Sequence, residues 1–185
     1  YYKALVSSEA RRIHIDGFTF GLAGASTIQE LAICLAQLSE YTQSLIEEGL
    51  GLEEIADSFY STLSVNDEYF TNIAKFRAYQ ILLGHFFKSF DEYFELDNSV
   101  INGQTNYRHM AKNDRYNNLL RSTTQAMSAI LGGCANLQVT PFDKSNVVSE
   151  RMARNIQLVL KEEAYFDKVN DPSAGSYYIE DLTNQ

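Results

Sequence analysis

Apolar and polar residues alternate along the chain in a pattern that predicts four strands, each followed by a helix. The first strand is expected over residues 12–18, where Ile13 and Ile15 alternate with His14 and Asp16. The other strands are predicted over residues 57–65, 98–105 and 135–142. The helices are predicted over residues 26–48, 67–87, 112–133 and 145–164, with a short helical turn over 52–56.

Cap residues support these helix boundaries. Ser26 or Thr27 can accept a hydrogen bond at the start of the first long helix, and Gly49 can end it. The later caps are predicted at Asn66 or Asp67 and at Asn113 or Asp114. Residues 1–10 have the pattern of the last turns of a helix, and a turn is predicted around Asp171.

Regular alternation of strands and helices predicts an α/β fold with a parallel sheet. Four β/α units at this spacing are half of a (β/α)8 barrel. An open, flavodoxin-like sheet is the alternative, but strands buried in such sheets are richer in valine and isoleucine than these. Half a barrel leaves two open edges, so this piece is expected either to self-associate through them or to be poorly stable.

The charge of the chain limits the classes of partner, and its cysteines indicate the redox compartment. The chain has 185 residues and a formal net charge of -9, which disfavours binding to nucleic acid or to an anionic membrane. Cys34 and Cys134 belong to no CxxC motif and are expected to be free thiols in a reducing cytoplasm. Because the chain opens at Tyr1 without a methionine, it is expected to be a fragment of a longer protein.

Polar residues at the end of the third strand form the best candidate site that the pattern alone provides. Gln104, Thr105 and Asn106 lie where barrel enzymes place their substrate contacts. The amide of Gln104 could bind a carbonyl or an amide group, although a polar loop cap explains it equally well. The three histidines share no metal-ligand spacing, and no metal site is predicted.

Three longer stretches resemble one protein family. "DRYNNLLRSTTQAMSAILGG" and "RMARNIQLVLKEEA", the latter followed by "VNDPSAGSYYIEDLT", are similar to two motifs of the methylmalonyl-CoA mutase family. "GFTFGLAGASTIQELA", followed downstream by "IAKFRA", is similar to a third. The resemblance extends from Ile13 to Asn184, and its second motif is long and specific, so the chain is identified as a member of this family.

The resemblance implies a fold and a reaction. Residues 1–185 would be the C-terminal half of an acyl-CoA-binding (β/α)8 barrel, that is, its last four β/α units and the start of the linker after it. A separate cobalamin-binding domain would lie outside these residues. Family members use a radical from adenosylcobalamin to interconvert methylmalonyl-CoA and succinyl-CoA, and the protein orients and shields the cofactor.

Several residues depart from the family pattern where that pattern contacts substrate. Thr19 replaces a histidine that donates a hydrogen bond to the thioester carbonyl, and threonine has no imidazole. Ser58 and Tyr60 replace an arginine and a serine that contact coenzyme A, so a charge-assisted contact is lost. Gln138 replaces a histidine, and Lys144 replaces an active-site glutamate. Gln104 is retained, although the Ser-Gly-Trp after it is not.

In carrying these replacements, the chain resembles the small (beta) subunit of a heterodimeric mutase, which has lost the catalytic residues. The chain is therefore predicted to be non-catalytic, to stabilise a catalytic large (alpha) subunit, and to meet acyl-CoA and adenosylcobalamin only through the holoenzyme. Gln104, Thr19, Ser58 and Tyr60 are kept as substrate-binding candidates. Two alternatives remain: an active acyl-CoA mutase of different specificity, and a regulatory binding module derived from the barrel. A cobalt-ligating histidine motif in the full-length sequence would favour the first, and loss of partner binding would favour the second.

Overall fold

The computed structural model describes residues 13–97, 99–143 and 146–185. Its sheet has four parallel strands in sequential order. The strands are β1 (Ile13–Asp16), β2 (Phe59–Val65), β3 (Val100–Thr105) and β4 (Asn136–Gln138). One row across the sheet pairs Asp16 with Thr62, Thr62 with Asn102, and Asn102 with Asn136. The prediction of a parallel α/β fold is confirmed.

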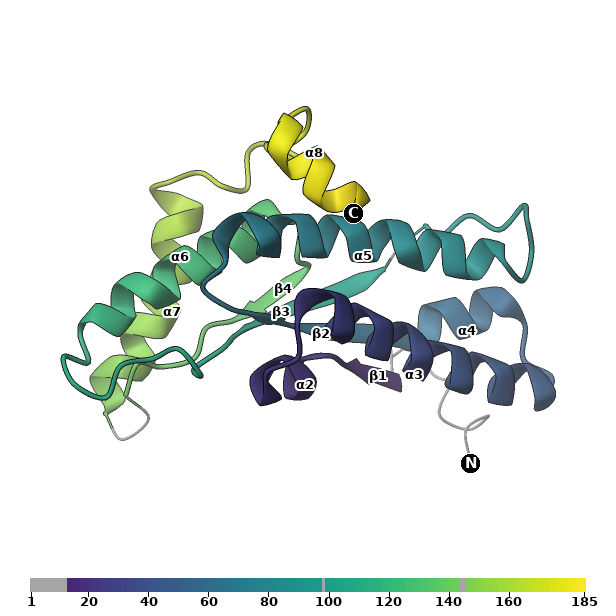
Figure 1. Ribbon diagram of the computed structural model, residues 1–185, viewed down its shortest axis with the longest axis horizontal. Coiled ribbons are helices and arrows are strands. Elements are labelled where there is room, and N and C mark those ends of the chain that lie inside the picture. The colour runs from purple at the N-terminus through teal and green to yellow at the C-terminus, as the bar shows by residue number, and fades with distance from the viewer. Residues whose placement is uncertain (1–12, 98, 144–145) are drawn as a thin grey trace.

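The helices follow the strand order around the outside of the sheet (Figure 1). They are α2 (Phe18–Ala23), α3 (Thr27–Glu47), α4 (Leu52–Ser58), α5 (Tyr69–Lys88), α6 (Asn117–Leu131), α7 (Val147–Glu162) and α8 (Tyr177–Asn184). Helix α3 contacts α5, α5 contacts α6, and α6 contacts α7. A flavodoxin-like sheet reverses its strand order at a switch point, whereas these four strands run in sequence. The arrangement is half of a (β/α)8 barrel.

The main core lies between the sheet and the helices. Ile15 and Leu63 are fully buried on the outer face of the sheet, as their alternation with polar residues predicts. Helix α3 buries an apolar stripe at helical spacing against them: Leu31, Cys34, Leu38 and Leu45. A second cluster joins α6 to α7 and contains Ala126, Val139, Ala153, Ile156 and Leu160.

The start of α3 confirms one of its two predicted caps. The Ser26 hydroxyl accepts a hydrogen bond from the Gln29 amide at 3.3 Å, and the Gln29 side chain accepts one from the Ser26 amide at 2.9 Å. This reciprocal capping box fixes the first turn of α3. The cap of α5 was placed too early, because Asn66 accepts from the Glu68 amide in a local turn and the helix begins at Tyr69.

Three further differences from the predicted boundaries have a clear local cause. The loop before α6 is longer because Asp114 adopts a left-handed φ of 54°, so the helix begins at Asn117. Strand β4 ends at Gln138 because Thr140 bonds the side chain and carbonyl of Thr105 instead of extending the ladder. The helix expected to begin at residue 145 begins at Val147, because the Asn146 side chain caps it by accepting a hydrogen bond from the Val148 amide at 2.9 Å. The helical pattern of residues 1–10 lies outside the described residues.

Helix α2 is not predicted by the pattern. Strand β1 ends at Asp16 rather than at residue 18, because the Asp16 carboxylate accepts hydrogen bonds from the Thr19 amide at 3.0 Å and hydroxyl at 2.5 Å. These bonds turn the chain into one short helix. Gly24 ends it with a left-handed φ of 106°.

An arginine clamp holds α8 against α5. Arg77 donates from Nη1 to Asp171 and from Nη2 to Glu180 Oε1, the latter at 2.7 Å. Glu180 Oε1 also accepts a hydrogen bond from the Gly175 amide at 3.0 Å. That amide, together with the Arg77 guanidinium, lowers the pKa of the Glu180 carboxyl below its ordinary value. The guanidinium of Arg77 thus binds both α8 and the loop before it, which contains Asp171.

Replacing Arg77 with alanine is expected to release α8. The variant loses two charge-assisted hydrogen bonds, whose exposure to solvent keeps their contribution to stability modest. Amide hydrogen exchange over residues 171–184 should therefore speed up by about tenfold, while exchange in α3 stays unchanged. Arg154, an exposed residue of α7, gives the control substitution Arg154→Ala. Unchanged exchange in α8 of Arg77→Ala would show that the clamp contributes little.

Candidate functional site

The inner face of the sheet carries polar side chains around a groove of about 450 Å³. In a (β/α)8 barrel this face is the interior, which explains why it is polar where the outer face is apolar. The lining residues are His14, Asp16, Phe18, Tyr60, Thr62, Asn102, Gly103, Gln104, Asn136, Leu137 and Gln138. We call this surface the inner groove.

Interactions between neighbouring strands order the inner groove. The His14 ring stacks on the Tyr60 ring with their centroids 4.6 Å apart. His14 Nε2 lies 2.8 Å from Thr62 Oγ1, within hydrogen-bond distance. On the other side of the groove, Asn136 Nδ2 donates to Asn102 Oδ1 at 2.9 Å. These side chains are therefore held by each other across the strand pairs.

The predicted site residues divide between the inner groove and other places. Gln104, Gln138 and Tyr60 line the groove, and Gln104 pairs with Gln138 in the register of β3 and β4. Thr19 is an exposed residue of α2 that bonds Asp16 rather than lining the groove. Ser58 is buried just before β2, where its hydroxyl donates to the Ile55 carbonyl at 2.7 Å. Lys144 lies outside the described residues.

A buried polar network lies at the carboxyl ends of β2 and β3. Glu30 Oε1 accepts from the Ser64 amide at 2.6 Å, and Glu30 Oε2 lies 2.9 Å from Lys75 Nζ. Lys75 Nζ also donates to the Ser64 carbonyl. Asn106 Nδ2 donates to Ser64 Oγ at 3.1 Å, and Gln125 Nε2 donates to the Asn106 carbonyl at 3.3 Å. Residue pattern alone did not single out Glu30 or Lys75.

Burial dominates the electrostatics of this network. The side chains of Lys75 and Glu30 are 1% and 3% exposed. Desolvation raises the pKa of the Glu30 carboxyl above its ordinary value, although Lys75 and the Ser64 amide act to lower it. A charge pair this deep depends on both partners, because either charge alone would lack compensation. The network is a structural feature that joins α3, β2, α5 and α6.

The inner groove is suited to hydrogen bonding rather than to nucleophilic chemistry. Among the described residues, its lining contains neither lysine nor arginine, so it offers no side-chain cation to a phosphate. Cys34 and Cys134 do not line it, and burial raises the pKa of each thiol to about 12. Such thiols are poor nucleophiles. No group of three or more metal-ligating side chains occurs within the part of the chain that the structure describes.

Comparison with known proteins identifies the family. A family model described as methylmalonyl-CoA mutase matches residues 2–185. The chain belongs to the methylmalonyl-CoA mutase family. The predicted family resemblance is therefore confirmed.

The chain is similar both to small subunits and to proteins named simply as mutases of this family. It is 40% identical to the methylmalonyl-CoA mutase small subunit of Porphyromonas gingivalis over 180 residues, which are 94% of this chain and 29% of that protein. It is 32% identical to the small subunit of Propionibacterium freudenreichii subsp. shermanii, covering 97% and 29% of the two chains. It is 35% identical to the mitochondrial methylmalonyl-CoA mutase of Homo sapiens, covering 99% and 25%. The chain thus spans less than a third of the length of these relatives.

The stretches that resemble the methylmalonyl-CoA mutase family contain the residues of one buried ion pair and of the partly exposed clamp on α8. Glu30 and Lys75 belong to "TIQELA" and "IAKFRA", and they form the buried ion pair. Arg77 and Glu180 belong to "IAKFRA" and "GSYYIEDLT", and they form the clamp on α8. The family motifs retained here therefore hold the fold together. None of the helices among the described residues is long and apolar enough to cross a membrane.

Proposed function

We propose that this chain is part of the small (beta) subunit of an adenosylcobalamin-dependent methylmalonyl-CoA mutase and that it is itself non-catalytic. Residues 1–185 form the last four β/α units of its acyl-CoA barrel, followed by the start of the linker. The subunit pairs with the catalytic large (alpha) subunit in the cytoplasm. The names of two relatives support this proposal, because a small subunit implies a large one.

One observation carries the proposal. At the position of the family's histidine, the Thr19 hydroxyl donates to the Asp16 carboxylate in the first turn of α2, so it serves the local fold. The groove that would receive a CoA ester has no lysine or arginine among its described lining residues. Its amides and hydroxyls can orient a neutral group but cannot pair with phosphate charge.

The described lining of the inner groove offers one imidazole as a possible cobalt ligand, and the family resemblance places the cobalamin-binding domain outside these residues. His14 is the one imidazole in the described lining of the inner groove, and it is stacked on Tyr60 and bonded to Thr62. A metal-ligating imidazole has a second-shell partner on its other nitrogen, so with Nε2 bonded to Thr62 only Nδ1 of His14 could ligate a metal. We therefore assign adenosylcobalamin to the holoenzyme and not to these residues, and we derive no step through it.

The role left to this chain is to complete the barrel of the small subunit and so to stabilise the assembly. Strands β1 and β4 are the edges of the described sheet, and each leaves backbone groups that another strand can bond. The other half of a barrel would cover both edges at once. Contact with acyl-CoA then occurs through the large subunit, and the outer surface of this barrel contributes to assembly.

The proposal predicts that the inner groove can be altered without loss of turnover. The variant Gln104→Ala/Gln138→Ala is introduced into the small subunit and assembled with the large subunit. Methylmalonyl-CoA turnover should stay within about twofold of the unaltered enzyme, whereas loss of one hydrogen-bond donor from a catalytic site costs about 100-fold or more.

The variant Lys75→Met provides the control. It breaks the buried ion pair and should reduce the yield of assembled enzyme, which shows that the assay responds to damage in this subunit. If Gln104→Ala/Gln138→Ala assembles normally and turnover falls by about 100-fold, the groove is catalytic and the proposal fails.

A further inference from the structure

An apolar groove of about 460 Å³ runs between α3 and α5 on the outside of the half-barrel. We call it the α3–α5 groove. It is lined by Thr27, Ile28, Leu31, Ala32, Leu35, Thr71, Ala74, Lys75, Ala78, Ile81, Leu82, His85, Leu182, Thr183, Asn184 and Gln185. It faces away from the inner groove, since its walls are the outer helices. The role proposed above for the inner groove therefore does not involve it.

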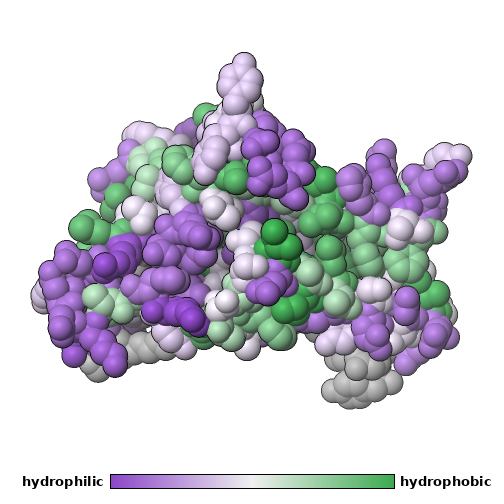
Figure 2. All heavy atoms as spheres, in the orientation of Figure 1, coloured by the Kyte–Doolittle hydropathy of each residue, from purple (hydrophilic) through white to green (hydrophobic). Residues whose placement is uncertain are grey.

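Some of the apolar residues along the α3–α5 groove are exposed, whereas Leu31 and Ala74 form its buried floor. Ile28 is 76% exposed on α3, and Ile81 is 47% exposed on α5. Figure 2 shows apolar surface gathered over this part of the molecule. Three of the lining residues are alanines, which let a neighbouring backbone approach closely. A continuous apolar surface between two helices is typical of a binding site for another element.

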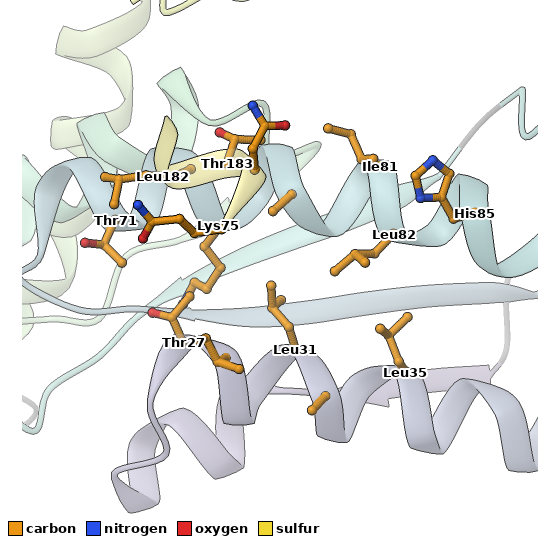
Figure 3. A pocket seen from close by; sticks show the side chains of 16 residues that line it. Thr27, Leu31, Leu35, Thr71, Lys75, Ile81, Leu82, His85, Leu182 and Thr183 are labelled. Carbon is orange, nitrogen blue, oxygen red and sulfur yellow. The ribbon is translucent and has the colours of Figure 1, made fainter. Parts of the chain in front are cut away.

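Helix α8 already covers one end of this groove. Figure 3 shows Leu182 and Thr183 beside Thr71 and Lys75, whereas Leu82 lies toward the opposite, uncovered end. Within α8, Ile179 and Thr183 are buried four residues apart and Leu182 is half-buried. The helix therefore presents one apolar face, and that face meets the groove.

We propose that the α3–α5 groove binds an amphipathic helix that continues the line of α8 and is supplied by the same, longer polypeptide. Continuation of the i, i+3, i+4 pattern of α8 would place further apolar residues on the uncovered part of the groove. The relatives named above are more than three times as long as the part this chain matches, so such a segment has room in the polypeptide. This inference rests on the proposed function, in which residues 1–185 are one part of a small subunit.

Cysteine accessibility tests the inference. Ile81→Cys is placed in the longer small subunit and in a version that stops after Gln185, and the rate of maleimide labelling is measured in each. We expect labelling to be at least about tenfold slower in the longer subunit, since a docked helix must open before the thiol reacts. The native Cys34 and Cys134 react slowly because burial raises the pKa of both thiols to about 12. Leu158→Cys, 57% exposed on α7, is the control for general reactivity.

Other occupants give different results. Equal labelling of Ile81→Cys in the two versions overturns the proposal. Protection that grows with the concentration of the shorter version indicates a second copy of the chain, and protection that requires the large subunit indicates a partner; both also overturn it. Turnover is measured separately in the assembled enzyme, so a failure here leaves the non-catalytic role untouched.

Discussion

Replacing Glu30 with alanine should lower the free energy of unfolding by about 3–5 kcal/mol, because it leaves the buried ammonium of Lys75 without a counter-charge. The side chain of Lys75 is 1% exposed, and its remaining oxygen contact is with the Ser64 carbonyl. The Ser64 amide loses its acceptor in the same substitution. Urea unfolding followed by circular dichroism measures the change through the midpoint.

A double-mutant cycle separates the ion pair from the loss of packing. The variant Glu30→Leu/Lys75→Leu removes both charges together. Its loss in the free energy of unfolding should be smaller, by about 2 kcal/mol or more, than the summed losses of Glu30→Leu and Lys75→Leu measured singly. If the destabilisation of the double variant equals the sum of the two single values, Glu30 and Lys75 do not act as a pair. The assignment of this network as a central support would then be wrong.

Gly21→Ala should be the most disruptive of the small substitutions. A Cβ atom at Gly21 would lie 2.4 Å from the Ser64 Cβ and 3.1 Å from Glu30 Oε2. Both neighbours belong to the buried network, so neither can move without breaking a hydrogen bond. Overpacking of this kind costs about 1–3 kcal/mol in the free energy of unfolding.

Gly84→Ala in α5 provides a matched control, because a Cβ there meets nothing within 4 Å. Alanine loses less backbone entropy than glycine in a helix, so this variant should gain about 0.5–1 kcal/mol. The two variants are compared by urea unfolding under the same conditions. Equal stability of Gly21→Ala and the unaltered chain would show that α2 packs less closely on β2 than the structure indicates.

The periodicity of the chain was sufficient to predict the architecture. Ile13 and Ile15 mark the outer face of β1, and the apolar stripe of α3 marks a helix that covers it. Both signals are short-range and strong, which is why the alternation of strands and helices could be predicted. The capping box at Ser26 is equally local and was also predictable.

Features that depend on tertiary contacts were harder to predict from the sequence. Glu30 and Lys75 lie 45 positions apart, and each by itself resembles an ordinary exposed charge on a helix. Only the packing of α3 against α5 brings them together. Similarly, β4 is short because the Thr140 amide donates to Thr105 Oγ1. This contact joins two separate segments, so the local pattern cannot predict it.

The candidate site depended on the family resemblance more than on the residue pattern. His14 and Gln104 both line the inner groove, but only Gln104 was singled out from the residue pattern. The burial of Ser58 outside that groove could not be predicted, because a single serine does not indicate at which end of a strand it lies. The roles assigned to Thr19, Gln138 and Lys144 remain predictions.

Turnover of methylmalonyl-CoA to succinyl-CoA with added adenosylcobalamin tests the non-catalytic role most directly. The assay compares the full-length small subunit alone, the large subunit alone, and their mixture. We predict no turnover by the small subunit alone, with activity from the large subunit or the mixture. Clear turnover by the small subunit alone would contradict the proposal and would make Gln104 and Thr19 the first residues to replace.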